Sequence, residues 1–335
     1  MSVFLAILLL VLSVFVGGYL LTRDWARTHR ARTAKLPLVG AGDPPADGLV
    51  RIATRDGEFR ARLANFDKGD EALLLLHGFP QSSASWEPLI ERAAAAGYRV
   101  VAYDQRGYSP GARPRPVDEY AIDRLVGDVL AVADALRIER FHLIGHDWGA
   151  AIGWALVLTN PARVLSWTAL SIAHSYAFLD AVRNDPDQRR RSAYFLLFRL
   201  RGVAELLLGW GRQRLLRKLM YRCMPASHVE EYQAILSEPG ALRAALNYYR
   251  AMGRRGRLTP DPEVTVPTLF IWGNRDPAAG RTAAEATARY MRGEYRFVEL
   301  DAGHWLLETR TGAVVSAVLG HVSANSEATR PDQQS

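Results

Sequence analysis

Eight short apolar runs recur along the chain and alternate with longer segments of helical periodicity. Such runs, bounded by turn residues, are typical of buried strands, and their alternation with helices is typical of a mostly parallel sheet with helices on its faces. The predicted strands are residues 49–54, 59–66, 71–77, 98–104, 140–146, 164–171, 267–273 and 295–301. The sequence therefore predicts an α/β fold built on a single eight-stranded sheet.

A long interval, residues 175–263, separates the sixth predicted strand from the seventh and has helical character throughout. It is too long for an ordinary connection. We interpret it as a helical lid inserted above the sheet, with residues 49–174 and 264–323 forming the core. The polar C-terminal residues, 324–335, are expected to be a disordered tail.

Residues 1–22 contain no charged side chain and are numerous enough to cross a bilayer as a helix. Neither basic residues before this run nor a small-residue cleavage site after it is clear, which favours an uncleaved transmembrane anchor over a signal peptide. Residues 23–48 are expected to be a basic juxtamembrane segment and a linker. The basic residues that follow the anchor are Arg23, Arg27, Arg30, Arg32 and Lys35, against one acid, Asp24. By the positive-inside rule the rest of the chain is expected to face the cytoplasm.

Composition argues against several other functional classes. The formal net charge is +7, but the arginines are spread among apolar residues, with no basic tail or aromatic nucleic-acid motif, so a nucleic-acid partner is not expected. Cys223 is the single cysteine, which excludes an intrachain disulfide. The sequence shows no metal-ligand cluster or phosphate-binding loop, so we expect neither a metal nor a cofactor.

The most specific local motif is the segment LIGHDWGAA, residues 143–151. It joins a predicted strand to a helix, which is the strand–turn–helix setting of a nucleophile elbow. Gly145 and Gly149 allow a sharp turn that holds Asp147 in a strained, accessible position. Because the N-terminus of the following helix favours negative charge, Asp147 is predicted to be an ionised nucleophile.

Further signals lie after other predicted strands. Phe79 follows the third strand in the stretch LLLLHGFP, where its amide is expected to form an oxyanion hole with the amide of Trp148. Asp276 follows the seventh strand, and His304 follows the eighth. The order nucleophile, acid, histidine, each beyond the carboxyl end of a strand, predicts a catalytic triad of Asp147, Asp276 and His304.

With these motifs, nearly the whole chain beyond the linker resembles the α/β-hydrolase superfamily, and within it the epoxide hydrolase and haloalkane dehalogenase branch, which uses an aspartate nucleophile. The phrases HGFP and GHDWGA and the tract at 102–114, AYDQRGYSPGARP, are especially similar to bacterial epoxide-hydrolase-like proteins. The resemblance implies that Asp147 attacks an sp3 carbon and forms a covalent ester. Water activated by His304, which Asp276 orients, would then hydrolyse that ester.

The same resemblance implies an acid for the leaving oxygen. An epoxide oxygen departs as a strongly basic alkoxide, which a tyrosine with a reference pKa of about 10 can protonate. Epoxide hydrolases of this family carry two lid tyrosines. The tract YFLLFRLRGVAE resembles the first tyrosine segment and places it at Tyr194. The tract ALNYYRAM resembles the second, with Tyr248 in place of a tryptophan and Tyr249 at the tyrosine position.

Two alternatives remain open. A haloalkane dehalogenase on the same scaffold would be expected to carry Asn at the position of Phe79, or a halide-binding Trp in the lid, and neither is obvious. A non-catalytic, membrane-associated hydrolase-like binding protein would usually lack the nucleophile or the histidine, whereas this chain has Asp147 and His304. The sequence therefore favours an epoxide hydrolase that acts on a small lipophilic substrate, with the lipid bilayer as its partner through the N-terminal helix.

Overall fold

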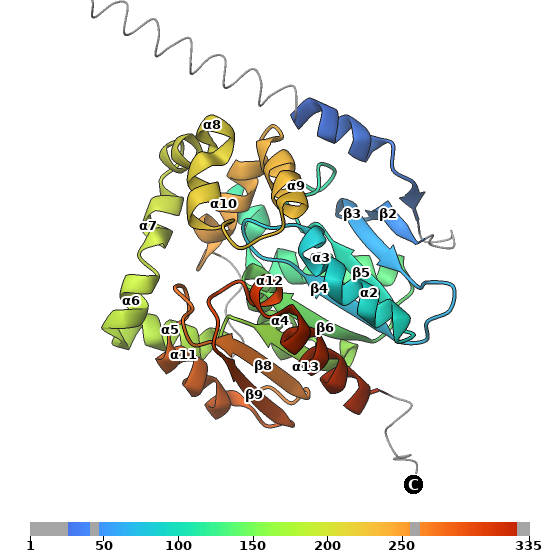
Figure 1. The fold of residues 1–335 in the computed structure, drawn as a ribbon, viewed down its shortest axis with the longest axis vertical. Helices are drawn as coiled ribbons and strands as arrows, with labels where there is room; N and C mark the ends of the chain where they lie inside the picture. Colours follow the sequence, from blue (N-terminus) through green and yellow to red (C-terminus); the bar gives the residue numbers. More distant parts are fainter. Residues whose placement is uncertain (1–25, 41–46, 255–261, 327–335) are drawn as a thin grey trace, which may run out of the picture.

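The computed structural model describes residues 26–40, 47–254 and 262–326, and its centre is a nine-stranded sheet (Figure 1). The strands are β1 (Leu38–Val39), β2 (Gly48–Thr54), β3 (Gly57–Ala64), β4 (Ala72–Leu76), β5 (Arg99–Tyr103), β6 (Phe141–His146), β7 (Val164–Leu170), β8 (Thr268–Gly273) and β9 (Tyr295–Leu300). Their order is β1-β2-β3-β5-β4-β6-β7-β8-β9, and every pair is parallel except β2 with β3 and β3 with β5. The predicted α/β fold with a mostly parallel sheet is confirmed.

The predicted count of eight strands is wrong, because β1 forms inside the segment interpreted as a linker. Leu38 pairs with Arg51 and Val39 with Ile52, in parallel register with β2. A strand of two residues is too short to produce an alternating pattern, so only its pairing reveals it. Residues 26–34 of the same segment are helical.

Helices cover both faces of the sheet because its central strands are apolar on both sides. In β4, Leu74 and Leu76 pack in the cluster that includes α3 (Ile122–Ala135) and α4 (Trp148–Thr159). Leu73 and Leu75 pack in a second cluster with α2 (Glu87–Ala95) and α13 (Thr311–Ala324). Successive side chains of a strand point to opposite faces, so a fully apolar strand requires two covering layers. Two shorter helices, α11 (Arg281–Ala286) and α12 (Leu306–Thr309), complete the core.

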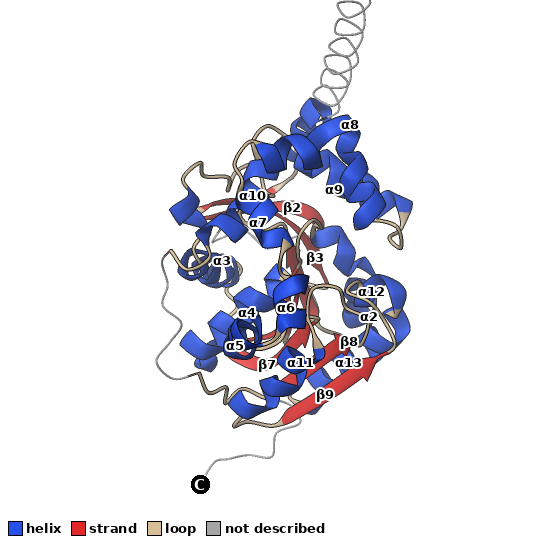
Figure 2. Cartoon of the chain, turned by 90° about the vertical axis from the view of Figure 1, so that its left-hand side faces the viewer, coloured by secondary structure: helices blue, strands red, loops and turns tan. Residues whose placement is uncertain are grey.

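The described residues between β7 and β8, in the interval predicted to form the lid, contain six helices. They are α5 (Ser175–Asn184), α6 (Pro186–Arg191), α7 (Tyr194–Arg199), α8 (Val203–Leu219), α9 (Ala226–Ser237) and α10 (Ala241–Ala251). Helices α8, α9 and α10 form a group at one end of the molecule (Figures 1 and 2).

A charge network fastens this lid to the core. Glu231 of α9 accepts hydrogen bonds from Arg60 Nη2 at 2.9 Å and from Arg62 Nη2 at 2.6 Å, both on β3. Arg60 is buried and also donates to the buried carboxylate of Asp104. A buried charge that loses its partner is strongly destabilising, so the network fixes the position of α9 over the sheet.

The predicted transmembrane anchor, residues 1–22, lies outside the described residues, as do residues 327–335 of the predicted tail. Within the described part of the chain, no helix is both long enough and apolar enough to cross a membrane.

Candidate active site

Asp147 lies between β6 and α4 with φ of 52° and ψ of −116°, a conformation that non-glycine residues rarely adopt. The chain around it can approach only because two neighbours lack side chains. A Cβ added at Gly149 would lie 1.9 Å from the Leu76 carbonyl oxygen, and one added at Gly145 would lie 2.4 Å from the Gly149 carbonyl oxygen. The turn therefore holds Asp147 at the carboxyl end of the central strands, as the elbow motif predicted.

The structure brings together the three residues predicted as a triad. His304 Nδ1 lies 2.8 Å from Asp276 Oδ2, and His304 Nε2 lies 3.4 Å from Asp147 Oδ2. The other oxygen of Asp276 accepts the backbone N–H groups of Ala278 at 2.7 Å and Ala279 at 3.1 Å. These amides fix the carboxylate of Asp276, which in turn orients the imidazole.

The charged groups of this cluster shift one another's pKa values. Burial alone disfavours an imidazolium, but the carboxylates of Asp276 and Asp147 outweigh it and raise the pKa of His304 to about 10. Burial likewise disfavours the Asp147 carboxylate, but the hydrogen bond and charge of His304 outweigh it and hold the pKa of Asp147 below its ordinary value. At neutral pH the site therefore holds an ionised Asp147 beside a protonated His304.

The two oxygens of the Asp147 carboxylate have different surroundings. The Phe79 amide donates to Oδ1 at 2.7 Å, while Oδ2 faces His304. The second predicted oxyanion donor, the amide of Trp148, belongs to the first residue of α4; among the described residues the carboxylate accepts no hydrogen bond from it. Oδ1 is thus held by a backbone N–H group, whereas Oδ2 lies beside the imidazole.

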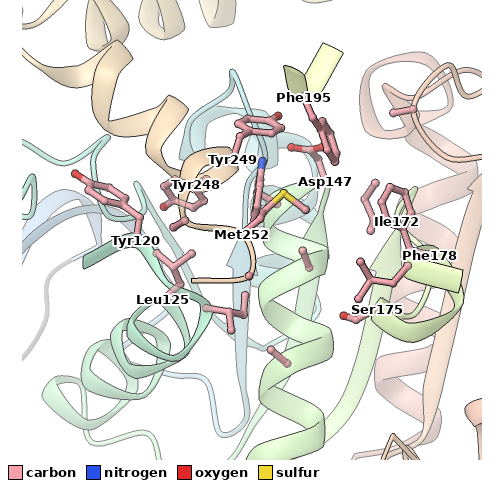
Figure 3. Close-up of a pocket in the computed structure, with 18 of the residues that line it drawn as sticks. Tyr120, Leu125, Asp147, Ile172, Ser175, Phe178, Phe195, Tyr248, Tyr249 and Met252 are labelled. Carbon is pink, nitrogen blue, oxygen red and sulfur yellow. The ribbon is translucent and has the colours of Figure 1, made fainter. Parts of the chain in front are cut away.

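A pocket of about 850 Å³ opens beside Asp147. Aromatic and aliphatic side chains dominate its wall. Those labelled in Figure 3 include Tyr120, Leu125, Ile172, Phe178, Phe195 and Met252. Such a lining suits an apolar ligand of moderate size.

Both predicted lid tyrosines line this pocket. The rings of Tyr194 on α7 and Tyr249 on α10 are 6.0 Å apart between centroids. Burial raises the pKa of each phenol well above its ordinary value, so both remain protonated and can donate. Tyr248 differs, because its hydroxyl already donates to the Arg106 carbonyl oxygen at 2.8 Å.

Sequence reasoning did not identify the residues that hold the His304 loop in place. The His304 carbonyl oxygen accepts hydrogen bonds from His146 Nε2 at 3.0 Å and from Ser171 Oγ at 2.8 Å. His146 Nδ1 lies 3.0 Å from Gln81 Oε1, and Gln81 Nε2 contacts Glu308. Burial raises the pKa of Glu308 to about 7. In the sequence, Glu308 has the appearance of an ordinary surface carboxylate, and only tertiary packing reveals its burial.

Comparison with known proteins shows the family to which the chain belongs. A family model described as the alpha/beta hydrolase fold matches residues 71–311. The chain is 34% identical to the AB hydrolase superfamily protein YfhM of Bacillus subtilis, over 75% of this chain and 89% of the relative. It is 32% identical to Epoxide hydrolase A of Mycobacterium tuberculosis, over 76% and 90% of the two chains. It is 29% identical to human Epoxide hydrolase 4, over 86% of this chain and 83% of the relative.

Solved structures show the same relationship. A Bacillus megaterium epoxide hydrolase in complex with an inhibitor superposes with a TM-score of 0.74 at 26% identity, covering 82% of this chain and 99% of that one. Epoxide Hydrolase A from Mycobacterium thermoresistibile superposes with a TM-score of 0.71 at 27% identity, covering 83% of this chain and 98% of that one. The chain belongs to the α/β-hydrolase family and is a hydrolytic enzyme similar to the epoxide hydrolases of that family.

Proposed function

We propose that this enzyme opens lipophilic epoxides to vicinal diols through a covalent ester on Asp147. The observation that carries the proposal is the carboxylate at the elbow, with Oδ1 held by the Phe79 amide and Oδ2 facing His304. A carboxylate displaces a leaving group from an sp3 carbon, whereas its attack on an ester carbonyl would give an unstable anhydride. The apolar pocket and the two buried phenols support an epoxide over a more polar substrate.

In the first step, Oδ2 of Asp147 attacks one epoxide carbon, and the bond from that carbon to the epoxide oxygen breaks. The departing alkoxide takes a proton from the phenol of Tyr194 or Tyr249, which leaves a tyrosinate. The product of this step is a neutral hydroxyalkyl ester of Asp147.

The second step follows from the loss of charge on Asp147. Once the carboxylate is an ester, only Asp276 holds the proton of His304, so the pKa of His304 falls and its proton can pass through solvent to the tyrosinate. Neutral His304 then accepts a proton from water as the hydroxide attacks Cγ of Asp147. The oxyanion forms on Oδ1, within reach of the Phe79 amide, with the Trp148 amide as the proposed second donor. The oxyanion then collapses and breaks the bond between Cγ and Oδ2 of Asp147, and the departing alkoxide takes the proton from the His304 imidazolium and leaves as the diol. The Asp147 carboxyl group, which now contains one oxygen atom from water, returns its proton to His304.

The first prediction concerns the ester. His304→Gln removes the base for water attack and leaves the nucleophile in place, so the variant should alkylate and stall. After incubation with an epoxide, intact-mass measurement should show an increase of one substrate mass. The matched control, Asp147→Ala in the same background, should show no increase. An adduct in that control would identify a different nucleophile.

The second prediction concerns the phenols. Tyr194→Phe and Tyr249→Phe should each slow enzyme alkylation, and the double variant should lose about 10²–10⁴-fold, the range typical of general acid assistance. Tyr248→Phe is the matched control, because the Tyr248 hydroxyl donates to the Arg106 carbonyl, and its effect on the alkylation rate should be much smaller. Rapid-quench measurement of ester formation separates these outcomes.

Assays of diol formation and of halide release distinguish an epoxide hydrolase from a dehalogenase. Displacement of a halide requires no proton, so a dehalogenase would tolerate loss of both phenols. We expect diol formation from aryl and aliphatic epoxides and no halide release from haloalkanes. Steady halide release, or a double phenylalanine variant that alkylates at the normal rate, would assign the site to dehalogenation.

The third prediction concerns pH. The pKa of His304 is about 10 in the folded chain, against an ordinary value of 6.5 for an unfolded chain. Its charge therefore stabilises the fold fully below pH 6.5, and this stabilisation is lost as the pH rises towards 10. Urea unfolding should show that the stability difference between wild type and His304→Gln shrinks over this interval. A constant difference would contradict the paired imidazolium.

We further propose that residues 1–22 anchor the enzyme in a bilayer, with the hydrolase domain in the cytoplasm. The support is the uncharged sequence of this segment and the basic residues that follow it. The fourth prediction is that the full chain pellets with membranes and that its hydrolase domain resists protease added outside intact cells. Digestion from outside, or recovery of the intact chain in the soluble fraction, would refute the proposal.

A further inference from the structure

The lid carries a concentrated apolar surface that faces solvent. Among the described residues, the exposed large hydrophobic side chains number eight, and all but Leu38 fall between residues 196 and 219. They are Leu196, Leu200, Val203, Leu206, Leu207, Trp210 and Leu219. We call the first six of these the α7–α8 surface, and leave out Leu219, which lies at the end of α8 beyond the positive-φ residues Gly211 and Gln213. Apolar side chains gathered on one surface in this way mark a contact site.

Helix α8 shows how the surface forms. Leu208 and Leu216 point inward and are buried in the core cluster. On the other side, Val203, Leu207 and Trp210 recur at spacings of three and four residues, so they share one outward face. The first half of the helix therefore has apolar side chains on both its inner and its outer side. Packing of the lid uses only the inner side chains, so it does not explain the outer ones.

Basic side chains border this apolar face. Arg214, Arg217 and Lys218 are exposed in the second half of α8, and the Arg214 guanidinium lies 5.7 Å from the centre of the Trp210 ring. Arg199, the last residue of α7, is exposed and donates to the Tyr249 carbonyl oxygen at 3.2 Å, and Arg201 is exposed between α7 and α8. Among the described residues no ion pair joins a carboxylate to either arginine. Exposed leucine and tryptophan side chains beside basic side chains are typical of segments that rest in the interface of an anionic bilayer.

The position of the surface agrees with such a contact. The first described helix, residues 26–34, lies at the same end of the molecule as α8 (Figure 1). The residues that precede this helix in the sequence include the uncharged run 1–22. A bilayer that held this run would therefore lie near α8.

Helix α7 connects the surface to the pocket. Tyr194 and Phe195 line the pocket, whereas Leu196 and Leu200 are exposed on the outside. We propose that the α7–α8 surface rests on an anionic lipid bilayer and that lipophilic substrate enters the pocket from the lipid. Entry of substrate from the lipid rests on the proposed epoxide hydrolase function, whereas the membrane contact does not.

A fluorescent probe in the full-length protein tests the contact directly. Cys223, the single cysteine, is exposed and is replaced by serine, and Leu206→Cys then carries an environment-sensitive fluorophore. The protein is reconstituted into phosphatidylcholine–phosphatidylserine vesicles that contain spin-labelled lipid. Glu139→Cys is the matched control, because Glu139 is exposed just before β6, at the opposite end of that strand from Asp147.

We expect the spin-labelled lipid to quench the probe at 206 and to leave the probe at 139 unaffected. A probe at 206 that is unquenched in vesicle-bound protein would overturn the proposal. A blue-shifted but unquenched probe would overturn it as well, because it would show that protein, either the N-terminal segment or a second copy of the chain, covers the surface.

Substrate entry is tested by a variant that keeps the active site intact. The triple variant Leu206→Ser, Leu207→Ser and Trp210→Ser should hydrolyse a water-soluble epoxide at the wild-type rate. For a lipophilic epoxide presented in vesicles, kcat/KM should fall about tenfold, which corresponds to about 1.4 kcal/mol. An equal kcat/KM for both proteins would refute entry from the lipid. Failure of the wild type on both epoxides would refute the proposed function instead, and probe quenching would still decide the membrane contact.

Discussion

One imidazolium between two buried carboxylates is the interaction on which this site depends. His304 lies within 2.8 Å of Asp276 and 3.4 Å of Asp147, and each of these groups would be costly to bury alone. The sheet supplies the geometry, because β6, β8 and β9 end at the same edge and deliver the three side chains to one point. In the proposed mechanism, formation of the ester removes the negative charge of Asp147 and thereby converts the protonated His304 into a base.

The lid contributes the two proposed acids as well as a cover. Tyr194 and Tyr249 reach the pocket from α7 and α10, so the proposed acids are in place only when the lid is seated on the core. The ion pairs of Arg60 with Asp104 and with Glu231 tie α9 to β3, and the buried apolar side chains of the lid pack in the same core cluster as the sheet. The lid therefore has two distinct surfaces, an inner one that completes the site and an outer one that remains apolar and exposed.

The sequence predicts this architecture where a residue's role follows from its place after a strand. Phe79, Asp147, Asp276 and His304 are identifiable because each follows a predicted strand, and the structure brings them together. Three features depend on tertiary pairing and are not predicted by the sequence: the two-residue strand β1, the partly buried Glu308 beside Gln81, and the ion pair from Glu231 to β3. Periodicity indicates that α8 is a helix, but its exposed apolar face becomes visible only when the buried side of the helix is known.

The covalent role of Asp147 is the central claim, and the source of the oxygen in the product tests it most directly. An excess of enzyme is allowed a single turnover of an epoxide in water labelled with heavy oxygen. If Asp147 is the nucleophile, the diol should contain no heavy oxygen and the peptide containing Asp147 should gain one heavy oxygen atom, because the new hydroxyl oxygen comes from the carboxylate and an oxygen from water replaces it. A labelled diol with an unlabelled Asp147 peptide would show direct attack by water and would contradict the account.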